Sequence, residues 1–233
     1  IKFDKDIRAK SLSMSKKVRH RGPDWSGIYT SDNAILAHER LSIVDIKSGK
    51  QPLFSSNKKM VLTVNGEIYN HQYFRDSNKI DYDFQTNSDC EVIIPLFDKY
   101  GPDMLNMING IFAFVLYDNT SNSYFVARDP IGVIPLYMGK DENGTIYFAS
   151  EMKCLVGNCI EIKEFPPGHY MTNNDNIPKK YYSKNWMKFD GVKNYSSTKE
   201  LRESLEDAVK RQLMSDVPFG VLLSGGLDSS IIS

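Results

Sequence analysis

Cysteine, histidine, net charge and long apolar runs are all scarce in this sequence of 233 residues. Its three cysteines, Cys90, Cys154 and Cys159, contain no CxxC pair and leave an odd number, which favours a reducing compartment over a disulfide framework. The 29 basic residues balance the 29 acidic ones, so no overall field favours nucleic acid or an anionic membrane. No apolar run approaches the roughly 20 residues of a membrane span, and the charged start is unlike a signal peptide. We therefore expect a soluble, cytoplasmic protein with small-molecule substrates.

What the sequence does contain is a glycine-rich segment close to its last residue. The apolar run Val221–Leu223 predicts a buried strand, and Ser224–Ser229 follows where that strand would turn into a helix. Glycines let backbone N–H groups approach an anion closely, and a helix N-terminus adds a favourable dipole. The alternative is an ordinary turn, because paired glycines alone are a weak signal. The serines and the aspartate at these spacings favour a phosphate site.

This segment resembles the SGGxDS motif of the ATP pyrophosphatase family, whose members split ATP into AMP and pyrophosphate. The resemblance places Leu222 near the adenine of ATP. It places five residues at the pyrophosphate end, namely Ser224, Gly225, Gly226, Asp228 and Ser229. Because the motif stands at the end of the chain, we expect a truncated α/β domain that binds ATP poorly by itself.

Short runs of aliphatic and aromatic residues, separated by turn residues, predict many β-strands in the preceding part of the chain. The polar segment Asp118–Asn122 predicts a hairpin turn between two of them. The predicted strands are Ala34–Ala37, Leu41–Val44, Met60–Val64, Ile111–Tyr117, Tyr124–Ala127, Ile146–Ala149 and Gly168–Met171.

Helical patterns interrupt these strands. Lys5–Val18 predicts one helix and Asp103–Ile108 another. Ser88 and Ser197 each stand three residues before a glutamate, which is the spacing of a capping box, and apolar residues at helical intervals follow both. Many strands with few helices favour an α+β domain over a doubly wound α/β domain.

The domain boundary is predicted from polar linker composition. Two polar segments, Thr172–Lys180 and Asp190–Ser197, could join domains, and the second lies closer to the glycine-rich segment. We therefore expect one domain over residues 1–195 and a second over residues 196–233.

Three segments of the first domain place polar groups beside the predicted strands. Arg40 starts the predicted strand Leu41–Val44 and could bind a carboxylate through two hydrogen bonds, with a surface ion pair as the alternative. Asn65 and Gly66 end another predicted strand and could donate N–H groups to an oxyanion, although Asn-Gly is also a hairpin signal. Asp89 begins a predicted helix and could accept an ammonium group or simply stabilise that helix. Together they describe a pocket for an α-amino acid with an amide side chain.

The segments that carry these groups resemble the glutaminase domain of glutamine-hydrolysing asparagine synthetases of the B type, over essentially the whole chain. They are Arg-His-Arg-Gly-Pro-Asp at 19–24, His-Glu-Arg-Leu-Ser-Ile-Val-Asp at 38–45, Asn-Gly-Glu-Ile-Tyr-Asn-His at 65–71 and Ser-Asp at 88–89. The resemblance implies an N-terminal-nucleophile fold, a four-layer αββα sandwich, followed by a synthetase domain of ATP pyrophosphatase type. It also implies that ammonia from glutamine converts aspartate, activated with ATP and Mg²⁺, into asparagine.

The resemblance assigns roles to individual residues of the first domain. Arg40 would bind the α-carboxylate of glutamine and Asp89 its α-ammonium group. Asn65 and the N–H of Gly66 would form the oxyanion hole. The same pocket would be lined by Leu41, Ser42, Ile43, Val44 and Glu67. Glutamine, aspartate and ATP are the implied substrates, a homodimer is left open, and we expect no metal site within this chain because no metal-ligand spacing is evident.

The nucleophile implied by the resemblance is an N-terminal cysteine whose own amine acts as the general base. The chain starts at Ile1, so we expect a short preceding piece to carry that cysteine, and we expect the chain without it to be inactive. Cys90 lies inside a predicted helix and lacks a free amine, so it is interpreted as a structural thiol.

Two other functions fit the same residues. A synthetase with this architecture and another acceptor, such as a β-lactam synthetase, would keep the glutamine site, and the acceptor pocket would lie beyond Ser233. A catalytically inactive glutamine-binding or assembly module would bind glutamine without releasing ammonia.

Overall fold

The chain divides into two units, Ile1–Ser183 and Lys184–Ser233, which are described separately. The predicted boundary between residues 195 and 196 stays a prediction. The computed structural model describes residues 5–76, 79–191 and 195–233.

The first unit is rich in antiparallel strands. They are β1 (Trp25–Thr30), β2 (Ile35–Arg40), β3 (Leu53–Phe54), β4 (Met60–Ile68), β5 (Gly110–Asp118), β6 (Ser123–Arg128), β7 (Tyr137–Lys140), β8 (Ile146–Ala149), β9 (Glu161–Glu164), β10 (His169–Thr172) and β11 (Lys179–Lys180). The largest sheet has the order β11-β10-β6-β5-β4-β3, and two smaller sheets have the orders β1-β2 and β8-β7-β9. The predicted hairpin turn between β5 and β6 is confirmed.

Helices flank these sheets. In the first unit they are α1 (Lys5–Lys16), α2 (His71–Asp76), α3 (Ile93–Tyr100) and α4 (Met152–Leu155), with 3₁₀-helices at Arg19–Arg21, Asp89–Val92 and Gly101–Asn106. None of the helices in the described ranges has the length and apolar character needed to cross a membrane.

Strand β5 shows why the largest sheet lies inside the fold. Phe112, Phe114 and Leu116 belong to a core shared with α3. Ala113 and Val115 belong to a second core, shared with side chains from the sheet β8-β7-β9. Because successive side chains of a strand point to opposite faces, an uninterrupted apolar run provides an apolar surface on both sides of the sheet.

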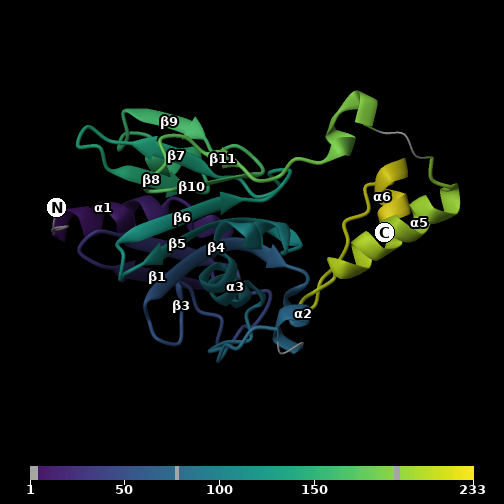
Figure 1. The fold of residues 1–233 in the computed structure, drawn as a ribbon, viewed down its shortest axis with the longest axis horizontal. Coiled ribbons are helices and arrows are strands. Elements are labelled where there is room, and N and C mark those ends of the chain that lie inside the picture. The colour runs from purple at the N-terminus through teal and green to yellow at the C-terminus, as the bar shows by residue number, and fades with distance from the viewer. Residues whose placement is uncertain (1–4, 77–78, 192–194) are drawn as a thin grey trace. The chain divides into compact units, whose positions relative to one another are not determined.

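Four layers result from these cores. Helix α3 covers one face of the largest sheet, and the two smaller sheets cover the other, as Figure 1 shows for α3 and for the sheet β8-β7-β9. Met14 of α1 and Leu155 of α4 then pack on the outer side of β7 and β8. The predicted α+β fold with an αββα sandwich is confirmed.

The second unit contains helices α5 (Thr198–Arg211) and α6 (Leu227–Ile232), preceded by short 3₁₀-helices at Asn185–Met187 and Phe189–Gly191. The predicted capping box of α5 is confirmed. The Oγ of Ser197 accepts the Glu200 N–H at 3.2 Å, and the Glu200 carboxylate accepts the Ser197 N–H at 2.7 Å. These bonds satisfy backbone donors that a helix start leaves without partners.

Some local predictions are wrong. Residues 41–44 form a loop after β2 instead of a strand, and the Ser42 N–H donates to Asp24 Oδ2 at 2.8 Å. Ser88 is the N-cap residue of the 3₁₀-helix Asp89–Val92 but forms no capping box, because its side chain makes no cap hydrogen bond and the buried Glu91 carboxylate accepts the N–H groups of Gln85 and Thr86 instead. Residues 221–223 form no strand and are exposed. The apolar runs at 41–44 and 221–223 resemble strands but are not paired as strands, and Ser88 and Glu91 have capping-box spacing but their side chains do not bond to each other's backbone as a capping box requires.

Candidate functional site

A cavity of about 1390 Å³ lies within the first unit. The residues that line it come from several elements, among them α1, β2, the loop after β2, β4, the 3₁₀-helix Asp89–Val92, β5, β6 and β8. Of the predicted glutamine-site residues, it brings together Arg40, Leu41, Ile43, Val44, Asn65, Gly66, Glu67 and Asp89. Ser42 does not line it and instead fastens the loop to Asp24.

Arg40 is the last residue of β2 and is only 5% exposed. Its Nη2 donates to the backbone carbonyl oxygens of Val44 at 2.9 Å and Asp45 at 2.6 Å. Burial lowers the pKa of the guanidinium, and the nearby Asp45 carboxylate partly offsets that effect. The surface ion pair considered as an alternative is therefore wrong, because Arg40 is a buried cation with a backbone-fixed orientation at the cavity wall.

Asn65 and Gly66 lie inside β4, which continues to Ile68, so neither ends a strand and the hairpin alternative is wrong. Gly66 pairs with Phe112 of β5 and has a φ of 145°. A Cβ at Gly66 would lie 2.1 Å from the Ile111 carbonyl oxygen. Only glycine fits this close approach of two backbones, and both Asn65 and Gly66 line the cavity.

Asp89 opens the 3₁₀-helix Asp89–Val92 and is 4% exposed. Its Oδ2 accepts the Ile68 N–H at 2.7 Å. Burial raises the pKa of this carboxyl, and the Ile68 hydrogen bond offsets part of the effect. Burial, followed by the charge of Asp89, likewise raises the pKa of Glu67. Two acidic groups that act on each other and line the cavity make their surroundings favourable for a cationic ligand group.

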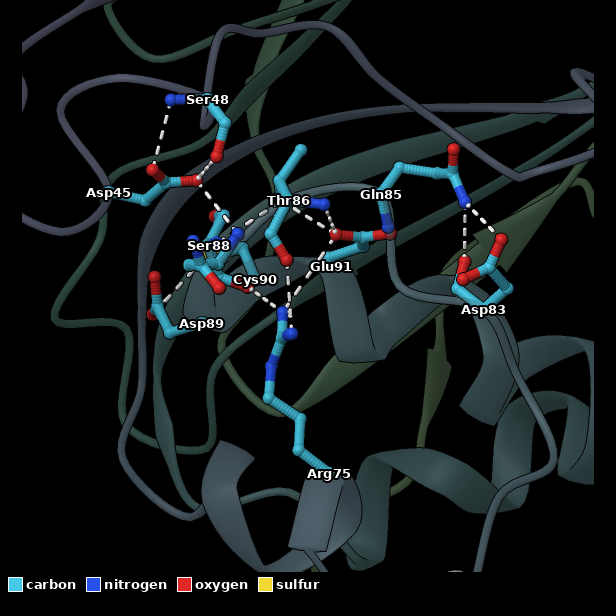
Figure 2. A network of polar contacts seen from close by, with 11 residues as sticks. Asp45, Ser48, Arg75, Asp83, Gln85, Thr86, Ser88, Asp89, Cys90 and Glu91 are labelled. Carbon is cyan, nitrogen blue, oxygen red and sulfur yellow. Dashed lines mark hydrogen bonds and ion pairs between the residues drawn. The ribbon is translucent and has the colours of Figure 1, made fainter.

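A polar network that the sequence reasoning missed fixes the segment before Asp89 (Figure 2). Arg75 of α2 donates to the carbonyl oxygens of Thr86 at 3.0 Å and Ser88 at 2.6 Å. Its Nη2 lies 3.8 Å from the fully buried Glu91 carboxylate. Glu91 in turn accepts the N–H groups of Gln85 and Thr86 at 2.7 and 2.8 Å. The only sequence signal was the Ser88–Glu91 spacing, which indicated a helix cap instead.

Asp45 contacts the same segment from the opposite direction. Its Oδ2 accepts the Asn87 N–H at 2.9 Å, and its Oδ1 accepts the Ser48 N–H at 3.0 Å. Burial acts to raise the pKa of Asp45, but the hydrogen bonds from Ser48 and Asn87 outweigh it and leave the pKa lowered. Asp45 is therefore an ionised carboxylate that joins the loop after Arg40, to which it belongs (the Arg40 loop), to residues 85–89 (the Asp89 segment).

None of the three cysteines has the surroundings of a nucleophile. Cys90 is buried, and its Sγ lies 3.5 Å from both the Gly66 carbonyl oxygen and Asp89 Oδ2. Burial and the Asp89 charge hold the pKa of this thiol well above its usual value. Cys154 and Cys159 pack in the core beneath α1. A reactive cysteine needs a stabilised thiolate, so these contacts support the interpretation of structural thiols.

The predicted ATP residues lie in the second unit. Leu222 is 98% exposed, and Gly225 has a φ of 80°. Gly226 is the N-cap residue of α6, with Asp228 in the first turn. The Ser224 and Ser229 hydroxyls lie 2.8 Å apart, and the Ser229 hydroxyl also donates to the Gly226 carbonyl oxygen at 3.0 Å. The glycine-rich turn and the following helix have the expected local form, and their role in ATP binding stays a prediction.

The described part of the chain contains no group of three or more His, Cys, Asp or Glu side chains placed to hold a metal ion. No ligand for Mg²⁺ is therefore assigned among these residues.

Comparisons with known families divide the chain in the same order as its motifs. Residues 1–184 match the family described as "Glutamine amidotransferase domain". Residues 200–233 match the family described as "Asparagine synthase".

Individual relatives agree with both matches. Asparagine synthetase B [glutamine-hydrolyzing] of Escherichia coli (strain K12) is 58% identical over 229 residues, covering 98% of this chain and 41% of the relative. A probable asparagine synthetase [glutamine-hydrolyzing] of Dictyostelium discoideum is 47% identical, covering 97% of this chain and 42% of the relative. The chain thus spans about two fifths of the length of these curated relatives.

A solved structure resembles the fold. The glutamine phosphoribosylpyrophosphate amidotransferase of B. subtilis, complexed with ADP and GMP, superposes with a TM-score of 0.58 and 25% identity. The match covers 73% of this chain and 44% of that one.

Proposed function

The chain belongs to the glutamine amidotransferase domain family, and we propose that its first unit binds glutamine and releases the side-chain amide nitrogen as ammonia. The observation that carries this proposal is convergence on one cavity. A buried guanidinium, an amide side chain, an unhindered strand N–H and a buried carboxylate, from segments distant in sequence, line the same space. An α-amino acid with a side-chain amide complements all of them.

Each polar group has a distinct role in this proposal. The Arg40 guanidinium binds the α-carboxylate of glutamine through the N–H groups that it does not donate to the Val44 and Asp45 carbonyl oxygens. Asp89, in its ionised form, accepts the α-ammonium group. Asn65 and the Gly66 N–H stabilise the oxyanion that forms when the amide carbon is attacked. Leu41, Ile43, Val44 and Glu67 complete the pocket, and Ser42 holds its loop in place through Asp24.

The attacking group proposed for the whole protein is the thiol of an N-terminal cysteine, as in the family that the sequence resembles. Attack on the side-chain carbonyl carbon forms the oxyanion, whose collapse expels ammonia and leaves a thioester. Water then cleaves the thioester and releases glutamate. The supporting observation within this chain is that the surroundings of Cys90 suppress its thiolate.

For the whole protein we propose asparagine synthesis from aspartate, ATP and glutamine. The match of residues 200–233 to the asparagine synthase family supports this reaction, as do relatives named asparagine synthetases. ATP would bind at the glycine-rich segment, and Mg²⁺ is proposed as its companion in the whole protein.

The setting of the whole protein is proposed from its cysteines and its charge. The unpaired state of all three cysteines supports a cytoplasmic location. The balanced charge supports small-molecule partners over nucleic acid. A homodimer stays a prediction.

The decisive experiment replaces Asn65 by alanine in the whole protein with its native N-terminus. We expect the rate of glutamate release from glutamine to fall about 10²- to 10³-fold, the usual loss for one oxyanion donor, with little change in KM. Asparagine formation with ammonia as the nitrogen source serves as the matched control and should be unchanged. Unchanged glutamate release would reject the oxyanion role.

The same assays separate the other functions. Glutamine binding without ammonia release by the wild-type protein would indicate an inactive binding module. Ammonia release without asparagine formation from aspartate and ATP would indicate a synthetase with another acceptor.

A further inference from the structure

Asp45 lies between the two groups that would bind the main-chain end of glutamine. It is only 6% exposed and adopts a left-handed backbone conformation with a φ of 53°. Its backbone carbonyl oxygen accepts a hydrogen bond from Arg40 Nη2 at 2.6 Å. A left-handed conformation is unfavourable for most residues, so its occurrence here indicates strong restraint by the surroundings.

The side chain of Asp45 contacts the segment that leads to the other binding group, Asp89. Its Oδ2 accepts the N–H of Asn87, which stands two residues before Asp89, and its Oδ1 accepts the Ser48 N–H. Figure 2 shows Asp45 and Ser48 beside the segment that leads to Asp89. One residue therefore touches the Arg40 guanidinium through its backbone and the Asp89 segment through its side chain.

Both carboxylate oxygens of Asp45 accept backbone N–H groups, and this requirement is specific to a carboxylate. An asparagine side chain has one acceptor oxygen, and its amide nitrogen can only donate. Either orientation of the amide would place N–H against N–H at Ser48 or at Asn87. Asp45→Asn would therefore loosen the hydrogen bond from Ser48 or the one from Asn87, while leaving the volume of the side chain almost unchanged.

We propose that Asp45 is a positioning residue that sets the separation between the Arg40 guanidinium and the Asp89 carboxylate, and that it thereby selects ligands carrying both an α-carboxylate and an α-ammonium group. The inference rests on the proposed function of this site. Arg75 of α2 and Glu91 of the 3₁₀-helix Asp89–Val92 hold residues 86–88, and Asp45 supplies the link toward Arg40.

The test compares three amides in the whole protein with its native N-terminus. They are glutamine, 4-carbamoylbutanoate, which lacks the α-ammonium group, and 4-aminobutanamide, which lacks the α-carboxylate. For Asp45→Asn we expect KM for glutamine to rise about tenfold or more, the effect of one lost hydrogen bond to a charged group, with kcat within about threefold of wild type. The kcat/KM values of the two one-ended amides should change by less than about threefold, because neither depends on the separation.

A matched control is available at a similar carboxylate elsewhere. Asp118 accepts the Thr120 N–H at 2.7 Å and the Ser121 hydroxyl at 2.7 Å in the turn between β5 and β6. Asp118→Asn removes a comparable turn contact that touches neither Arg40 nor residues 87–89, and it should leave all three amides unaffected. Should Asp45→Asn fail to fold, Ser48→Ala provides the second test, because it removes the hydroxyl that helps to orient Asp45 Oδ2, the oxygen that also accepts the Asn87 N–H. A rise of about threefold in KM for glutamine alone is expected there.

Three results would overturn the inference. The first is unchanged selectivity for glutamine over the two one-ended amides in a folded Asp45→Asn protein. If Asp45→Asn does not fold, the same result in Ser48→Ala counts. Either would show that Asp45 does not set the separation between the Arg40 guanidinium and the Asp89 carboxylate. An equal loss for all three amides would show general damage to the site. Failure of the wild-type protein to hydrolyse glutamine would instead overturn the proposed function, and this inference with it.

Discussion

The glutamine site proposed for the first unit and the ATP segment proposed for the second are built in opposite ways. Arg40, Asp45 and Asp89 are each at most 6% exposed, and the Asn87 to Asp45 hydrogen bond joins residues 42 positions apart. Residues 224–228 are exposed, and side-chain hydrogen bonds of the segment span three to five positions. The first arrangement depends on tertiary contacts, whereas the second arises from local sequence.

This difference determines how far the effect of a substitution should spread. Buried polar groups that share partners respond together, because a lost partner leaves another buried group unsatisfied. Exposed groups can exchange a lost protein contact for water. Substitutions of the buried polar groups that share partners in the first unit should therefore alter glutamine turnover from a distance, and substitutions in the second unit should not.

Gly66→Ala should produce the largest effect. The added Cβ would meet the Ile111 carbonyl oxygen at 2.1 Å and Phe112 Cα at 2.6 Å, so β4 and β5 cannot keep their pairing. We expect glutamate release to fall by about 10³-fold or more, because a misplaced backbone N–H no longer meets the oxyanion. Kinetic assays and thermal unfolding of the same preparation would measure it.

Gly101→Ala is the matched control for backbone strain. Gly101 also has a positive φ, of 56°, but a Cβ there would meet no atom within 4 Å. A destabilisation of about 1 kcal/mol with unchanged turnover is expected. Activity of Gly66→Ala within tenfold of wild type would contradict the dependence of this site on strand pairing.

Arg40→Lys should have the next largest effect. A lysine ammonium cannot reproduce the planar guanidinium, which donates to the Val44 and Asp45 carbonyl oxygens and still has N–H groups for a carboxylate, so KM for glutamine should rise about 10- to 100-fold. Arg202→Lys on α5 is the control, since Arg202 forms an exposed ion pair with Glu206 in the second unit. Equal glutamine affinity in Arg40→Lys and wild type would refute the carboxylate-binding role.

The pH dependence of glutamine binding should give a smaller, graded effect. Burial raises the pKa of Asp89, and only its ionised form binds an ammonium group. As pH falls through this raised pKa, Asp89 becomes protonated and KM should rise, approaching about tenfold per pH unit below it. The stability of the fold changes in the opposite direction. Below the ordinary pKa of an aspartate, burial of the neutral Asp89 carboxyl makes its full contribution to the free energy of unfolding. That contribution is lost as pH rises through the raised pKa of Asp89 in the folded protein.

Substitutions identify the titrating group. Asp89→Asn should bind glutamine weakly and lose the acid rise in KM. Glu67→Gln should retain that rise, although Glu67 also has a raised pKa. If the rise of KM at acid pH disappears only in Glu67→Gln, the ammonium contact belongs to Glu67 instead.

Ser197→Ala should have the smallest effect and should stay within the second unit. It removes the side-chain half of the α5 capping box, which is worth about 1 kcal/mol of helix stability. Circular dichroism should show earlier melting of α5, with KM for glutamine unchanged. A changed KM would show that the two sites are coupled and that the second unit does not act by local contacts alone.

Local patterns predicted much of the secondary structure because they act between close neighbours in sequence. Strands β5, β6 and β10 and helices α1 and α5 lie near their predicted positions. Strands β1, β7 and β9 escaped prediction because glycine or charged residues interrupt their apolar residues, and these segments become strands by pairing. Residues 41–44 show the converse, since an apolar, branched run remains a loop where no strand lies beside it.

The sequence by itself determined which chemical groups are available and their order: Arg40, Asn65 with Gly66, Asp89, and the glycine-rich segment 224–229. It also determined the capping of α5, because a cap forms between residues three positions apart. Only the tertiary structure decided that Gly66 lies within a strand, that Arg40 is buried, and that Asp45 joins the Arg40 loop to the Asp89 segment. Sheet pairing and buried hydrogen bonds connect residues far apart along the chain, and no local pattern in the sequence records those connections.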